Sequence, residues 1–115
     1  MTESDFGDLL AAVKRAIGAD PALDRRIAST LDSQFADRSV PPYTASVDDC
    51  IALLDRVLPD WSWHVGYGPK GVLPYASVHN GEDRFVSSAP TVPLALLAAL
   101  LTARVAQDKR GVLSH

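Results

Sequence analysis

Two turn signals near the middle of the chain constrain its fold more than any other feature of the sequence. Asn80-Gly81 is a dipeptide typical of a two-residue β-hairpin, and Gly68-Pro69-Lys70-Gly71 has the composition of a four-residue turn. Stretches in which large and small side chains alternate lie on both sides of each turn. We therefore predict a three-stranded antiparallel meander, with strands at about 60–67, 72–79 and 82–87.

The two turns also predict a pairing register that separates the side chains into two faces. If Tyr67 pairs with Val72, and Ala76 with Phe85, the large side chains share one face. That face carries Trp61, Trp63, Val65, Tyr67, Val72, Val78 and Phe85. Large aromatic residues favour burial, so we expect this face to pack against helices. The expected core residues of the sheet are Trp61, Trp63, Val65 and Phe85. Pro74, near the start of the middle strand, predicts a bulge or a late start of pairing.

The opposite face of the predicted sheet is mixed in character. In this register His64 lies across from Tyr75, and His79 lies across from Glu82 beside the tight turn. The candidate contact residues of this face and of the sheet edges are His64, Tyr75, His79, Glu82, Asp83 and Arg84. The sequence leaves open whether this second face is covered or exposed.

Four further stretches predict helices. They span about 5–18, 21–35, 47–58 and 92–107. Gly18 is a stop signal for the first helix, and Ser46 is a start signal for the third. The fourth stretch is apolar nearly all round, which is typical of a helix buried on several sides, with Leu97 and Leu101 as expected core residues. We predict one α+β domain over residues 1–115, in the order α-α-α-β-β-β-α.

The charge balance disfavours one class of partner. The chain has 14 acidic and 11 basic residues, for a formal net charge of −3. Direct binding to nucleic acid needs a basic face that neutralises phosphates, so we expect none. An acidic surface instead suits a protein partner that is itself basic.

Cysteine usage and apolar runs predict the compartment. A single cysteine, Cys50, excludes a disulfide within the chain, and its place on an apolar helical stripe favours a buried thiol over a reactive one. The first residues lack the pattern of a secretory signal, and the apolar run at 92–106 is too short to cross a bilayer. We expect a cytoplasmic protein that does not interact with membranes.

The stretch WSWHVGYGPKG, residues 61–71, is the most conspicuous candidate for a ligand site. A phosphate loop requires four residues between its glycines and a Ser or Thr after the lysine, and this stretch has neither. Its aromatic residues could stack on bases or sugars, but the apolar character of their face favours core packing. No histidine has a matched nucleophile or carboxylate pair, so we expect no catalytic residues, metal or cofactor.

Three segments carry a resemblance to a known family. They are DPALDRRI at 20–27, PPYTASVDDCIALLDRVLPDWSWHV at 41–65 and APTVPLALLAALLTARV at 89–105. In this order they resemble small phage and prophage proteins of the alpha-beta-alpha sandwich type, a family of unknown function. The resemblance covers about residues 8–106 and implies an alpha-beta-alpha sandwich of phage or prophage origin. It supplies no catalytic residues, and the 68–71 turn departs from its pattern.

These observations lead to one main hypothesis and two alternatives. We expect a non-enzymatic, phage- or prophage-derived acidic protein that binds a host or phage protein. It would inhibit a host defence nuclease, as an anti-CRISPR protein does, or another nucleic-acid-handling protein. The edges at 60–67 and 82–87 also suit strand addition or a homodimer. One alternative is a small-ligand or nucleotide-binding module that uses His64, Tyr75 and Arg84. The other is a minor virion or assembly component.

Overall fold

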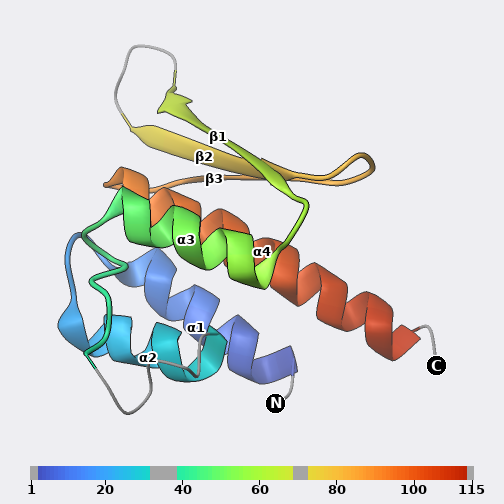
Figure 1. The fold of residues 1–115 in the computed structure, drawn as a ribbon, viewed down its shortest axis with the longest axis horizontal. Helices are drawn as coiled ribbons and strands as arrows, with labels where there is room; N and C mark the ends of the chain where they lie inside the picture. The colour runs from blue at the N-terminus through green and yellow to red at the C-terminus, as the bar shows by residue number, and fades with distance from the viewer. Residues whose placement is uncertain (1–2, 32–38, 69–72, 114–115) are drawn as a thin grey trace.

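A computed structural model describes residues 3–31, 39–68 and 73–113 of the chain (Figure 1). The elements are α1 (Glu3–Arg15), α2 (Pro21–Leu31), α3 (Val47–Val57), β1 (Ser62–Tyr67), β2 (Pro74–His79), β3 (Arg84–Ser88) and α4 (Val92–Leu113). The strands form one antiparallel sheet in the order β1-β2-β3. The predicted α+β class and the order of elements are confirmed.

The helices lie on one side of the sheet (Figure 1). α4 contacts β2, β3, α3 and α1, and α2 contacts α1. The layers therefore run from the sheet to α3 and α4, and then to α1 and α2, with the sheet as an outer layer and not in the middle of a sandwich. α4 has neighbours on several sides, which explains why apolar residues surround its axis.

The hydrophobic core forms around α4. Leu97 and Leu101 are fully buried, and Trp61, Val65 and Phe85 of the sheet region are half-buried and pack against the core. The other large, fully buried side chains are Leu9, Val13, Ile27, Tyr43, Leu53, Leu54, Leu58, Leu94, Leu96 and Leu100. All four helices thus contribute to a single core, which α4 shares with the sheet.

The first helix is shorter than predicted. It ends at Arg15, where the Ala16 amide donates to the carbonyl of Val13 at 3.2 Å and tightens the last turn. Ile17 lies beyond this turn and is 85% exposed, so it is not part of the buried stripe. The predicted extension of α2 over residues 32–35 lies outside the described residues.

The fourth helix is longer than predicted. Thr91 caps it, since its Oγ1 accepts from the Leu94 amide at 3.3 Å, and the helix continues through Gly111 to Leu113. One glycine costs a helix only about 1 kcal/mol, which is too little to end a long helix without a C-terminal cap.

The predicted start of α3 is confirmed. Ser46 adopts an extended conformation, and its Oγ accepts from the Asp49 amide at 3.2 Å. At the other end Leu58 caps the helix, and Asp60, with φ of 73°, turns the chain toward β1. Aspartate tolerates this left-handed conformation better than most residues.

The pairing of β1 with β2 differs from the predicted register. Tyr67 pairs with Pro74 and not with Val72, and Trp63 pairs with Val78. Residues 68–73 therefore join the strands; residues 69–71 of the predicted turn, and Val72, lie outside the described part of the chain. Pro74 begins β2, which confirms the late start of pairing, because proline has no N–H for the ladder.

The pairing of β2 with β3 also differs from the predicted register. Val78, not Ala76, pairs with Phe85, and His79 pairs with Arg84 and not with Glu82. The connection is the four-residue segment 80–83, because Oδ1 of Asn80 accepts from the amides of Glu82 and Asp83 at 2.9 and 2.8 Å. An asparagine that closes its own turn in this way stabilises a wider loop than the two-residue one.

The expectation that Trp63 is a core residue is wrong, since its side chain is 39% exposed. A helix about 10 Å wide covers only two strands spaced about 4.8 Å apart. α4 underlies β2 and β3. Of the inward side chains of β1, Val65 packs against the core, whereas Trp63 extends past the helix and Tyr67 is 64% exposed.

A buried polar network joins α2 to the segment before α3. Asp24 is 7% exposed, and its Oδ1 accepts from both the amide and the hydroxyl of Thr44 at 2.8 Å. The Thr44 hydroxyl oxygen accepts in turn from the Asp20 amide at 2.8 Å. Next to Thr44, Tyr43 is fully buried, so the network holds the turn that precedes α3 against the core.

Candidate functional site

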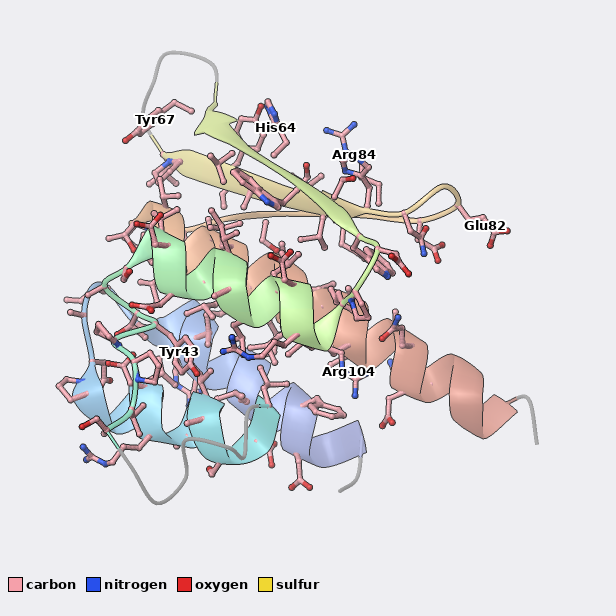
Figure 2. All side chains as sticks on the ribbon, in the orientation of Figure 1. Tyr43, His64, Tyr67, Glu82, Arg84 and Arg104 are labelled. Atoms are coloured by element: carbon pink, nitrogen blue, oxygen red, sulfur yellow. The ribbon has the colours of Figure 1, made fainter. Side chains whose placement is uncertain are left out.

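The sheet face that points away from the helices is the first candidate surface, and we call it the open face. It carries, strand by strand, Ser62, His64 and Gly66; Tyr75, Ser77 and His79; and Arg84, Val86 and Ser88. His64 and Arg84 are exposed and point away from the helices (Figure 2). Val86 is 54% exposed. The structure thus answers the question left by the sequence, because within the described residues the second face is largely uncovered.

Tyr75 holds His64 in place on the open face. The predicted pairing of His64 with Tyr75 is wrong: His64 pairs with Ser77, and Gly66 pairs with Tyr75. The two side chains nevertheless meet, because 3.1 Å separates Nε2 of His64 from the Tyr75 hydroxyl. The Tyr75 ring lies across Gly66, where a Cβ atom would come within 3.1 Å of it. Because Gly66 has no Cβ atom, the Tyr75 ring can lie directly over the backbone of β1.

A hollow of about 610 Å³ lies at the hairpin end of the open face. Its lining residues are His64, Ser77, His79, Asn80, Gly81, Glu82, Asp83 and Arg84. The structure thus brings together every candidate contact residue of the sequence except Tyr75, which contacts the hollow through His64. Sequence reasoning missed Ser77. Side chains alternate between the two faces along β2, so Ser77 shares a face with Tyr75 and His79, and this pattern could have identified it.

Ser77 is the most unusual residue of the hollow. Its side chain is fully buried, and its Oγ has no hydrogen-bond partner in the part of the chain that the structure describes. An unpaired buried hydroxyl costs about 1–3 kcal/mol, so such groups are rare in folded proteins. A ligand in the hollow, which Ser77 lines, would supply this hydroxyl with a partner.

The open face differs from the rest of the protein in charge. The chain contains 14 Asp and Glu residues, but none stands at an open-face position of the three strands. The charged groups there are Arg84 and, when protonated, His64 and His79. Glu82 and Asp83 line the hollow only from the hairpin tip. An acidic protein thus presents one face whose polar groups favour an anion.

The free edge of β1 is the second candidate surface. β1 is the first strand of the sheet and pairs only with β2 among the described residues. Its sequence SWHVGY has no proline, lysine or carboxylate, which are residues that protect edge strands from pairing. Trp63 and Tyr67 are exposed along it. This edge is therefore open to a further strand.

Cys50 is a buried core residue. The thiol lies 3.0 Å from the Tyr43 carbonyl oxygen, to which it donates, and its side chain is 1% exposed. Burial, with smaller contributions from the charges of Asp49 and Asp24, raises the pKa of the thiol from 9.0 to about 12. The reactive thiolate is therefore disfavoured in the folded chain.

We expect the Cys50 thiol to react slowly with a disulfide reagent at pH 9 in the folded protein and rapidly in urea. The folded state holds the thiol proton more tightly than the unfolded chain does. The protonated Cys50 thiol therefore contributes its full share to the stability of the fold below pH 9, and this contribution is lost as the pH rises toward 12. Absorbance of the released thiol chromophore measures the rates. Equal rates in the folded and unfolded chain would show that the thiol is accessible.

The site therefore belongs to a small α+β domain with a one-sided antiparallel sheet. None of the helices in the described part of the chain has the length and apolar character that a membrane crossing requires. The described residues contain no group of three or more His, Cys, Asp or Glu side chains placed to hold a metal ion. Comparison with protein-family models, curated proteins and solved structures finds no match for this chain. The resemblance to phage proteins stays a prediction.

Proposed function

We propose that the chain is a non-enzymatic interaction protein that binds an extended segment of a protein partner along β1. The observation that carries this proposal is the free edge of β1, on which Trp63 and Tyr67 are exposed. Backbone groups of an edge strand pair readily with an added strand. Alternate side chains of the added strand then meet those of β1, which supplies specificity.

The exposed side chains of β1 suit a protein interface. Tryptophan and tyrosine are the residues that most often dominate binding energy at interfaces. Trp63 is 39% and Tyr67 64% exposed, so both have apolar surface left to bury. Each side chain also lies beside the backbone groups of β1 that an added strand would pair with.

We take the partner to be a basic host or phage protein that handles nucleic acid. The net charge of −3 favours association with a basic surface, because complementary charge raises the association rate. The resemblance of the sequence to phage and prophage proteins favours an inhibitor of a host defence. In this role the chain occupies a surface of a host defence nuclease and carries out no reaction itself.

A photocrosslinking experiment in host cells tests the docking site. Tyr67 is replaced by p-benzoylphenylalanine, which is also aromatic, and the control places the same group at the exposed Arg26 on α2. We expect a crosslinked adduct from position 67 alone, and we expect Trp63→Ser to reduce its yield by about tenfold. Equal adducts from both positions, or a yield that Trp63→Ser leaves unchanged, would overturn the proposal. An adduct of twice the chain mass would show a homodimer in place of a foreign partner.

A further inference from the structure

We propose that the hollow at the hairpin end of the open face binds a nucleoside monophosphate. The phosphate would lie against His79 and Arg84, and the base against the ring pair of His64 and Tyr75. This proposal uses a different surface from the docking of a protein at β1 and does not depend on it.

His79 and Arg84 form the phosphate-binding end. They are direct partners in the register of β2 and β3, so both side chains rise from the open face next to each other. Neither side chain forms a hydrogen bond or ion pair within the described residues, and Arg84 is exposed. An arginine fork matches the geometry of a phosphate, and an imidazole N–H donates beside it. Two such donors without an acceptor favour an anion between them.

Ser77 supplies a third donor to the same place. It precedes His79 by two residues on β2, pairs with His64 of β1, and its hydroxyl is buried without a partner. The exposed His64 ring, held by its hydrogen bond to Tyr75, lines the same hollow as Ser77. A phosphate bound there would supply the acceptor that the Ser77 hydroxyl lacks among the described residues.

The rings of His64 and Tyr75 form the base-binding end. Their centroids lie 5.8 Å apart and their planes are inclined by 42°, so together they present a broad π surface. Aromatic side chains on a sheet stack on bases without regard to sequence. The row of His64 lies next to the row of His79 and Arg84, about 7 Å away, and the row of Tyr75 is one further, so a base stacked over His64 lies within the reach of one nucleotide. A hollow of about 610 Å³ is of the size that small ligands occupy.

The hairpin tip favours a small ligand over a nucleic-acid strand. Glu82 and Asp83 line the hollow at this end, and Glu82 points away from Arg84 at the tip (Figure 2). Their negative charges would repel the further phosphates of a polymer that ran past the hairpin. A single phosphate at His79 and Arg84 brings fewer negative charges to these carboxylates than a polymer does.

Isothermal titration calorimetry at low salt tests the proposal with adenosine 5′-monophosphate, inorganic phosphate, adenosine and a short single-stranded DNA. We expect saturable binding of the monophosphate, at least about tenfold tighter than that of phosphate or adenosine. Absence of saturable binding would overturn the proposal. Equal affinity for phosphate and the monophosphate would overturn the base contact, and tighter binding of DNA would overturn the small-ligand assignment.

Variants locate the site. We expect Arg84→Gln to weaken binding of the monophosphate by at least about tenfold, Arg84→Lys to weaken it less, and Arg26→Gln on α2 to leave it unchanged. Gly66→Ala pushes the Tyr75 ring and should reduce the preference for the monophosphate over phosphate. Thermal unfolding verifies that each variant folds. Binding that Arg84→Gln leaves unchanged would overturn the assignment, whatever the outcome of crosslinking at Tyr67.

Discussion

Replacement of Leu97 by alanine is expected to lower the free energy of unfolding by about 2–5 kcal/mol. Leu97 is fully buried on α4, the helix that contacts both the sheet and α1. Shortening this side chain removes apolar surface from the core and leaves a cavity that the surrounding elements can fill only in part. Urea unfolding, followed by the circular dichroism of the helices, measures the change.

Trp63→Ala is the matched control for this experiment. Tryptophan is the larger residue, but Trp63 is 39% exposed and lies beyond the helix layer. We therefore expect a loss of no more than about 1.5 kcal/mol, below that of Leu97→Ala. A loss as large as that of Leu97→Ala would contradict the exposure of β1 and would indicate that another chain covers this strand in solution.

Replacement of Asp24 by alanine is expected to lower the free energy of unfolding by about 2–4 kcal/mol. Oδ1 of Asp24 accepts two hydrogen bonds of 2.8 Å from Thr44, and the site is buried. Without the carboxylate, the amide of Thr44 loses its acceptor away from solvent, and the hydroxyl keeps only the longer contact of 3.4 Å to the Asp20 carbonyl. The cost of an unpaired buried amide exceeds the usual net value of a hydrogen bond.

Two further variants separate this network from a general effect of charge. Asp24→Asn keeps an acceptor oxygen and should lose less than Asp24→Ala. Asp55→Ala, on the exposed side of α3, removes the same charge and should change stability by no more than about 0.5 kcal/mol. If Asp24→Ala and Asp55→Ala had equal effects in urea unfolding, the network would not stabilise the fold.

The alternation of residues predicted the faces of the sheet even though both predicted registers were wrong. Each connection is wider than predicted, and each pairing shifts by an even number of positions, so that Trp63 meets Val78 and not Ala76. Because side chains alternate with a period of two, an even shift leaves every residue on its predicted face. For this reason His64, Tyr75 and Arg84 share a face as predicted.

Small residues explain what sequence reasoning missed at the site. Gly66 gives Tyr75 its position, and Ser77 places a buried hydroxyl in the hollow. Neither residue belongs to a recognisable motif, since their roles arise from side chains on neighbouring strands. Asn80 was recognised as a turn residue, but the bonds from Glu82 and Asp83 to its side chain, which widen the turn, depend on the folded loop.

The sequence by itself determined the order of the elements, the apolar character of α4 and the set of residues on each face of the sheet, because these properties follow from local periodicity. Only the tertiary structure decided which face and which strand stay exposed. α4 underlies β2 and β3, and one helix covers about two strands, so that Trp63 and Tyr67 of β1 stay exposed. The helices lie on one side of the sheet, so that the face with His64 is left open. Which strands a helix covers depends on the width of the helix relative to the sheet and on how the two pack, and the periodicity of the sequence does not predict this.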